Sequence, residues 1–331
     1  MNFPANLQSF IGNGRVVQIL RRAIDQQRLP HALIFAGPGG VGKRTLALIM
    51  AQRLNCPSPA HGEACNTCTS CSKIRNGLHP DVRIIEPEGA FIKIDQIRAL
   101  INEIAYQPFE GRYRVAILDG ADQLRIEAAN CLLKTLEEPP SKSFIVLVTA
   151  RPYSLLGTIR SRSRLLLFGS IPEDAIADYL IRNQGLSPED ARLAAVLSNG
   201  SLGAALGFDA AQGRETRQQA LRFVSLLLRK EKFAQASAFA AGILKEKEQF
   251  LPWIDMTFTL LQDVYYAQVA PERMSQRDLA GELTALARAS SRAAVVSGIQ
   301  AVKRLRAALQ RNVNRQLALE ALFLKETEPG A

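Results

Sequence analysis

A glycine-rich loop followed by lysine is the first stretch of this sequence that could do chemistry. It reads GPGGVGKRT from Gly37 to Thr45 and matches most of the phosphate-loop pattern G-x-x-x-x-G-K-[ST]. In such a loop the backbone N–H groups surround phosphate oxygens, and the lysine contacts the outer phosphates. The candidate nucleotide-binding residues are Gly37, Gly40, Gly42, Lys43, Arg44, Thr45 and, further along the chain, Asp119.

The position after the lysine departs from this pattern. Arg44 stands where a serine or threonine hydroxyl would hold magnesium, and Thr45 follows one residue later, about 100° further around a helix. Magnesium needs oxygen donors, so Arg44 cannot ligate it, although a guanidinium can pair directly with phosphate. We therefore expect no magnesium at this site, and the residues leave open whether ATP or ADP binds there.

A second departure lies in the stretch VAILDGADQL. Asp119 fits the carboxylate that a phosphate-loop ATPase places at a strand end for its metal. Gly120 occupies the next position, where a glutamate would activate the attacking water. Asp122 either substitutes for that glutamate or caps the following helix. Together with Arg44, this departure predicts a nucleotide site that lacks hydrolytic activity.

Four of the five cysteines are clustered, at Cys56, Cys65, Cys68 and Cys71. Their spacing, C-x8-C-x2-C-x2-C, can turn four thiolates toward one ion and complete a closed tetrahedral zinc site of structural type. The sequence shows no secretory signal, which favours metal over disulfides and predicts a cytoplasmic protein. His61 could replace one ligand, and Cys131 lies apart in an apolar helix pattern.

These residues need a scaffold, and the hydrophobic pattern predicts one. Helical segments alternate with short apolar runs through the first half of the chain, which indicates a parallel sheet with helices on both faces. Beyond Gly169 only helical patterns follow. The expected strands are Ala32–Ala36, VRIIEP from Val82, YRVAILDG from Tyr113, SFIVLVTA from Ser143, and Arg164–Phe168.

Composition limits the class of protein. The chain has 331 residues and a formal net charge of +10 at pH 7, with most of the basic excess in the first half. Such a field favours polyanions, including nucleic acid, without identifying a site. The longest apolar runs, such as FIVLV from Phe144, are too short to span a membrane, so no membrane partner is expected.

Several longer motifs carry a family resemblance. The stretch IGNGRVVQIL through GKRTLA, the four-cysteine insert, NCLLKTLEEPP, IRSRS and NVNRQLALEALFL together resemble bacterial replicative clamp-loader subunits of the AAA+ class. The similarity runs from about Ile11 to Leu324. Within that family the chain most resembles the delta-prime subunits of DNA polymerase III, rather than the hydrolysing gamma/tau subunits. Arg44 and Gly120 agree with that choice.

The resemblance implies a fold and a domain order. It implies an AAA+ phosphate-loop domain over residues 1–169 with a zinc module at 56–79. A helical lid at 170–208 and a helical collar for oligomerisation at 209–331 would follow. Collar contacts would come from helices near Val295–Leu309 and Leu317–Leu324. In the lid, Gly203 stands where an active subunit carries a sensor arginine that reaches its own nucleotide.

The resemblance also implies a function. Arg162 in IRSRS matches the family's arginine finger, which enters a neighbouring subunit's ATP site, although Ser163 replaces the usual cysteine after it. The subunit would be a non-hydrolysing member of a heteropentamer with gamma/tau and delta that loads the sliding clamp onto primed DNA. Contact with the clamp would be indirect or weak, and contact with DNA would be through its phosphate backbone.

Two other functions are compatible with parts of the sequence. A gamma/tau-like ATPase would need a hydroxyl at position 44 and an acidic residue at position 120, and both are absent. A zinc-containing protein that binds DNA alone would not account for IRSRS and the collar pattern together. We expect no independent ATPase activity, only membership of the DNA polymerase III holoenzyme, a DNA-directed DNA polymerase.

Overall fold

A computed structural model describes residues 6–60, 62–229 and 250–309 of the chain. These residues form two compact units. The first comprises Met1–Gly185 with Gly200–Leu206, and the second comprises Leu186–Asn199 with Gly207–Ala331. The predicted domain boundaries after residues 169 and 208 remain predictions.

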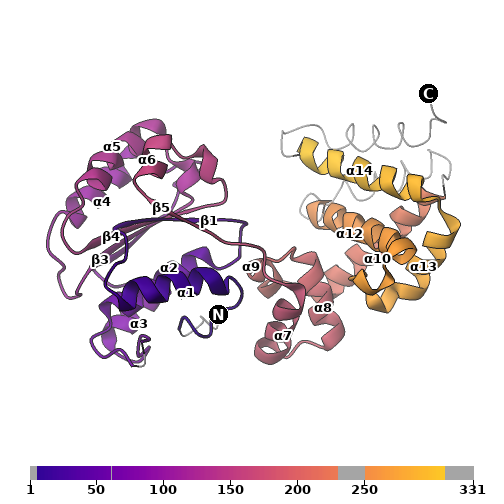
Figure 1. The fold of residues 1–331 in the computed structure, drawn as a ribbon, viewed down its shortest axis with the longest axis horizontal. Helices are drawn as coiled ribbons and strands as arrows, with labels where there is room; N and C mark the ends of the chain where they lie inside the picture. Colours follow the sequence, from indigo (N-terminus) through magenta and orange to yellow (C-terminus); the bar gives the residue numbers. More distant parts are fainter. Residues whose placement is uncertain (1–5, 61, 230–249, 310–331) are drawn as a thin grey trace. The chain divides into compact units, whose positions relative to one another are not determined.

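The first unit is built on a five-stranded sheet in the order β2-β3-β4-β1-β5, with every neighbouring pair parallel (Figure 1). The strands are β1 (Ala32–Ala36), β2 (Val82–Ile85), β3 (Arg114–Asp119), β4 (Ser143–Thr149) and β5 (Arg164–Leu167). All five expected strands are therefore present, and the predicted parallel α/β fold is confirmed.

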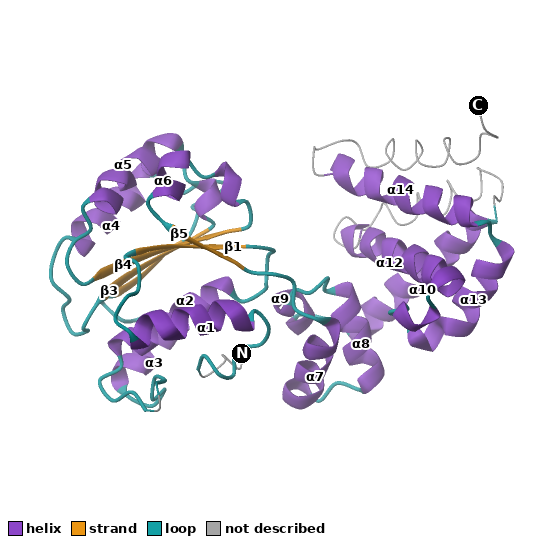
Figure 2. Ribbon diagram, in the orientation of Figure 1, coloured by secondary structure: helices purple, strands orange, loops and turns teal. Residues whose placement is uncertain are grey.

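Helices cover both faces of this sheet. Figure 2 shows α1, α2 and α3 on one face and α4, α5 and α6 on the other. Side chains alternate along β1: Leu33 and Phe35 pack with α1 and α2, whereas Ala32, Ile34 and Ala36 pack with α4 and α5. The helices are α1 (Gly14–Asp25), α2 (Lys43–Asn55), α3 (Thr69–Arg75), α4 (Ile94–Ile104), α5 (Ile126–Glu137), α6 (Gly157–Ser161), α7 (Glu173–Gln184) and α9 (Leu202–Leu206), with short 3-10 turns η1 (Ala121–Gln123) and η2 (Pro152–Ser154).

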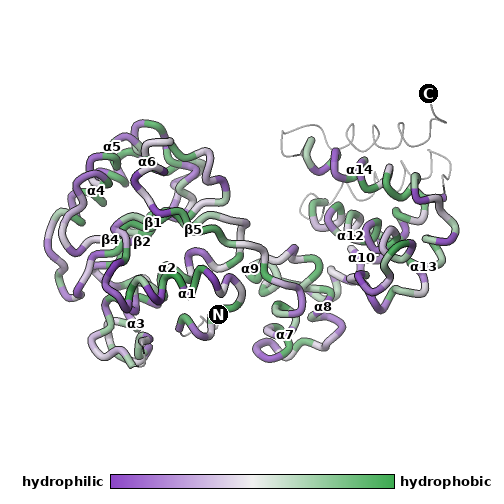
Figure 3. The backbone as a smooth tube through the Cα atoms, in the orientation of Figure 1, coloured by the Kyte–Doolittle hydropathy of each residue, from purple (hydrophilic) through white to green (hydrophobic). Residues whose placement is uncertain are grey.

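Figure 3 shows hydrophobic residues along the strands of the first unit. Burial on both faces explains the composition of β1, β3 and β4, whereas the edge strands β2 and β5 are partly exposed. The carboxyl ends of parallel strands meet at one edge, where open α/β sheets place their ligands. The loop after β1 and the end of β3 at Asp119 both lie there.

The second unit is helical in its described residues. It contains α8 (Pro188–Leu197), α10 (Ala210–Leu228), α12 (Phe250–Val269), α13 (Ala280–Ala289) and α14 (Arg292–Leu309), with 3-10 turns η3 (Pro271–Arg273) and η4 (Arg277–Leu279). Its core is organised around Trp253, which stacks on Phe250 and packs edge-on against Phe223.

Two sequence expectations concern this unit and membranes. The predicted helix Val295–Leu309 lies within α14, whereas Leu317–Leu324 falls outside the described residues. Among the helices that the structure describes, none is both long and apolar enough to cross a membrane.

Candidate functional site

The loop after β1 wraps around the lysine that follows it. Lys43 begins α2, is 7% exposed, and its ammonium donates to the carbonyl oxygens of Gly37, at 2.7 Å, and Pro38. Burial lowers the pKa of Lys43, against the opposing effect of the Asp119 and Asp122 carboxylates. The lysine is thus held by the carbonyl oxygens of its own loop.

A cavity of about 500 Å³ lies beside this loop, within the first unit. Its walls include apolar side chains that the sequence analysis did not identify, from the N-terminal segment and from α7 and α9. Of the predicted nucleotide-site residues, all but Gly37 line the cavity. The apolar lining includes Phe10, Ile11, Ile171, Tyr179, Leu202 and Leu206. A concave apolar pocket with a few convergent polar groups can hold a small molecule.

Arg44 is engaged in ion pairs at the rim of this cavity. Its guanidinium pairs with Glu86, and its Nη1 lies 3.4 Å from Oδ2 of Asp119. Glu86 follows β2 and Asp119 ends β3, so Arg44 joins the ends of two neighbouring strands. The carboxylate expected to serve a metal therefore faces a guanidinium.

The backbone at Gly120 disfavours an acidic side chain directly after Asp119. Its φ of 82° is left-handed backbone, which glycine adopts readily and a glutamate would adopt only under strain. Asp122 neither caps α5, whose N-cap is Arg125, nor is free to orient water. Its carboxylate accepts from Thr149 Oγ1 and Arg151 Nε, each at 2.9 Å. The expectation that Asp122 caps the next helix is wrong, because Asp122 lies within the 3-10 turn η1 and the N-cap position of α5 is occupied by Arg125.

Gly203 lies directly against the loop. Its N–H donates to the carbonyl of Gly40 at 2.9 Å, and a β-carbon at Gly203 would sit 3.2 Å from the Gly40 α-carbon. A side chain at this position would therefore require the loop to shift by a few tenths of an ångström.

Arg162 lies at the C-terminal end of α6, away from the cavity lining. Its Nη2 is 2.7 Å from Oε1 of Glu137, at the end of α5, and its Nη1 donates to the carbonyl of Thr158 at 3.1 Å. The side chain remains 36% exposed. These contacts orient the guanidinium while leaving it partly exposed.

The four clustered cysteines converge as predicted. The Sγ atoms of Cys56, Cys65, Cys68 and Cys71 all lie within 4.8 Å of one another, so the group could hold a metal ion. A tetrahedral site with Zn–S bonds of about 2.3 Å has sulfur–sulfur edges of about 3.8 Å, which this cluster reaches with small shifts. His61 lies outside the described residues.

Hydrogen bonding already favours thiolates at part of this cluster. The backbone N–H groups of Thr67 and Cys68 lower the pKa of Cys65 to about 6, whereas burial raises the pKa of Cys56 and Cys71. Cys131 lies on α5, partly buried against the core, and is not part of the cluster.

Comparison with known proteins identifies relatives for both halves of the chain. Residues 12–172 match the family model described as DNA polymerase III, delta subunit, and residues 211–327 match its C-terminal model. The chain is similar to DNA polymerase III subunit delta' of Bacillus subtilis, with 34% identity over 94% of both chains. The chain is also similar to the delta' subunit of Pseudomonas aeruginosa, with 31% identity over 89% of this chain and 91% of the relative.

Other similarities are narrower or weaker. The tau subunit of Bacillus subtilis is 36% identical, but over 52% of this chain and 31% of its own length. A solved gamma subunit-related protein from Thermotoga maritima covers 94% of this chain and 98% of its own, with 20% identity and a TM-score of 0.39. The fold class follows from the sheet order in this chain.

Proposed function

Because the chain belongs to the family of DNA polymerase III delta-prime subunits, we propose that it is a clamp-loader subunit that does not hydrolyse ATP itself. The proposed lack of ATP hydrolysis rests on the pairing of Arg44 with Glu86 and Asp119. It directs a fixed positive charge at the carboxylate that a hydrolysing site uses for its metal. Gly120 and Gly203 support the same conclusion.

The proposed complex joins this chain to gamma/tau and delta subunits in the cytoplasm. Its role there is to help load a sliding clamp onto primed DNA, with indirect or weak contact to the clamp. Any DNA contact is to the phosphate backbone, in keeping with the net charge of +10. The lid at 170–208 and the collar at 209–331 belong to this proposal.

The hydrolysing alternative is less well supported. A gamma/tau-like motor would be expected to resemble the tau relative throughout, yet that similarity covers about half of this chain. Similarity to delta-prime relatives covers nearly all of it. ATP or ADP in the cavity beside Lys43 would therefore have a structural role.

Within the complex, Arg162 is proposed to complete the ATP site of a gamma/tau neighbour. A guanidinium is permanently charged and offers a planar fork of donors to the γ-phosphate. An arginine supplied in this way accelerates phosphoryl transfer by about 10³-fold or more. The contacts with Glu137 and Thr158 support the proposal, because they hold a partly exposed guanidinium in one orientation.

The test of this role compares two neighbouring arginines. Arg162→Ala is expected to leave assembly intact while removing the share of clamp- and DNA-stimulated ATP turnover that depends on one site. Arg164→Ala, two residues away on β5 and exposed, is the matched control and should retain turnover. Equal turnover in the two variants would remove Arg162 from the mechanism.

The cysteine cluster is proposed to bind one structural zinc ion. Four thiolate ligands leave no open position for a substrate, so the ion would stabilise the segment between α2 and α3. The geometry of the four sulfur atoms supports this proposal.

A further inference from the structure

The ion pairs of Arg44 occupy a defined place in the fold. Arg44 is the second residue of α2, directly after the lysine that the loop surrounds. Its guanidinium lies between Glu86 and Asp119, at the carboxyl ends of β2 and β3. In a hydrolysing phosphate-loop protein, the residue after the lysine and the acid at this strand end share one magnesium ion.

The groups present here do not fit that ion. Magnesium needs six oxygen ligands in near-octahedral geometry. The residue after Lys43 is an arginine, whose side chain offers only N–H groups and no oxygen. The Asp119 carboxylate, 29% exposed, already faces a positive charge, and Lys43 lies near enough to interact with it electrostatically. The neighbouring Asp122 is turned toward Thr149 and Arg151. A divalent cation that bridges the carboxylates of Glu86 and Asp119 would have to displace Arg44.

We propose that Arg44 takes the place of the divalent cation in this site. Its single positive charge holds the ends of β2 and β3 together and excludes magnesium from the cavity. The site then keeps its shape without a metal, and any nucleoside phosphate that enters meets Arg44 and Lys43. This assignment concerns the isolated chain and does not depend on the clamp-loader proposal.

The test is to vacate the position and ask whether a divalent cation takes it. Arg44→Ser removes the guanidinium and supplies the missing hydroxyl, and Arg44→Ala removes it alone. Binding of Mn²⁺, a paramagnetic substitute for Mg²⁺, is titrated by electron paramagnetic resonance on the zinc-loaded full chain. Both variants should bind Mn²⁺ about tenfold more tightly than the unmodified chain, because a nearby repelling charge is lost. Adding Asp119→Asn to Arg44→Ser should abolish the gain.

Two further variants distinguish this role from a general loss of charge. Arg83→Ser removes an arginine from another exposed ion pair of the same sheet, with Glu103 at 2.9 Å, and should leave Mn²⁺ binding unchanged. Arg44→Lys keeps one positive charge and should also resemble the unmodified chain.

Thermal unfolding gives a second readout that needs no spin probe. The melting temperature of Arg44→Ser should rise with MgCl₂ relative to NaCl of equal ionic strength, while that of the unmodified chain should not. The proposal is overturned if the unmodified chain binds Mn²⁺ as tightly as Arg44→Ser, or if neither Arg44→Ser nor Arg44→Ala responds to divalent cations. Because these experiments measure cation binding by the isolated chain and not ATP turnover by the assembled complex, their outcome does not decide the clamp-loader role.

Discussion

A single methyl group at Gly40 tests whether the phosphate loop packs against the 200–206 segment as the structure shows. Gly40 has a φ of 68°, and a β-carbon there would lie 2.0 Å from the Ser201 hydroxyl oxygen. Alanine in left-handed backbone costs about 1 kcal/mol. Moving the Ser201 hydroxyl also breaks its hydrogen bond from the Ala204 N–H, at a cost of about 1 kcal/mol.

The expected loss for Gly40→Ala is therefore about 2 kcal/mol in the free energy of unfolding. For a unit of this size that lowers the melting temperature by about 4–8 °C. The assay is thermal unfolding of the zinc-loaded chain, followed by circular dichroism. Gly39→Ala is the control, because a β-carbon at Gly39 meets nothing within 4 Å. Equal melting temperatures for the two variants would refute the packing of the loop on Ser201 and Gly203.

Two further predictions concern the cysteine cluster and a buried carboxylate. Cys68→Ser should reduce bound zinc, measured by elemental analysis, from about one ion per chain to near zero. It should also lower the melting temperature in thermal unfolding. The control variant Cys131→Ser should keep the metal. Burial opposes ionisation of Asp81, but hydrogen bonds from the backbone N–H groups of Phe109, Gly111 and Glu110 outweigh it and lower the pKa. The stability that Asp81 contributes is then present above its unfolded pKa and is lost as pH falls through the folded value. Asp81→Asn should lower the free energy of unfolding by about 3 kcal/mol at neutral pH. In acid, the urea midpoints of the variant and the unmodified chain should converge. A difference between the two midpoints that stays constant at all pH values would contradict this.

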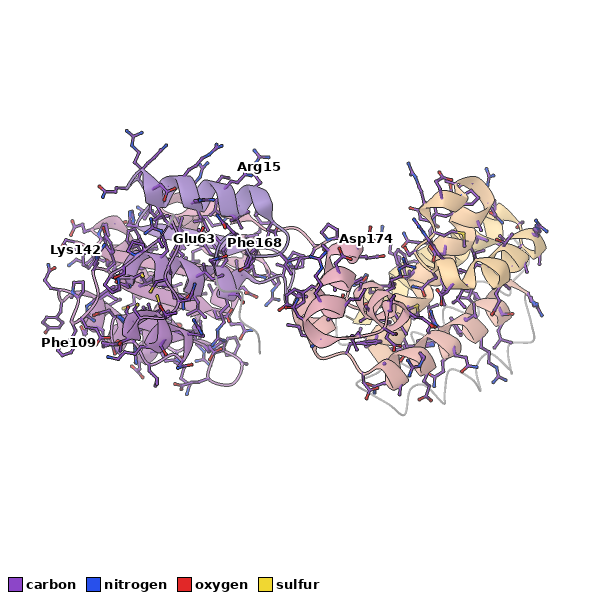
Figure 4. All side chains as sticks on the ribbon, turned by 90° about the horizontal axis from the view of Figure 1, so that it is seen from below. Arg15, Glu63, Phe109, Lys142, Phe168 and Asp174 are labelled. Carbon is purple, nitrogen blue, oxygen red and sulfur yellow. The ribbon has the colours of Figure 1, made fainter. Side chains whose placement is uncertain are left out.

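The Asp81 contacts also show why a surface feature could not be predicted from the sequence. Phe109 is 82% exposed at the periphery of the first unit, as Figure 4 shows, yet its backbone N–H is fixed 2.7 Å from the carboxylate of Asp81. The loop that carries Phe109 is therefore held by Asp81, which lies 28 positions earlier in the chain. No local pattern around Phe109 indicates that support.

The features that could be predicted are those contained in short segments. The five strands follow from apolar runs bounded by polar residues, and the cysteine cluster follows from its spacing, because neighbouring thiolates can converge through local turns. The glycine loop before α2 is also a local pattern. The fold class and the convergence of the four cysteine sulfur atoms could therefore be predicted from the sequence.

The partners of the key side chains could not be predicted because they depend on strand order. Glu86 is 42 residues from Arg44 and reaches it only because β2 lies beside β3 at the edge of the sheet. The available signal was an acidic residue directly after the strand VRII. Glu137 is similarly brought to Arg162 by the packing of α5 against α6.

Steady-state ATP hydrolysis tests the central claim most directly. The purified chain is measured alone and then mixed with gamma/tau and delta partners, with and without the Arg162→Ala substitution. The proposed function predicts no turnover by the chain alone and Arg162-dependent turnover in the mixture. Robust hydrolysis by the chain alone would contradict it, since Arg44 and Gly120 would then be compatible with an active site.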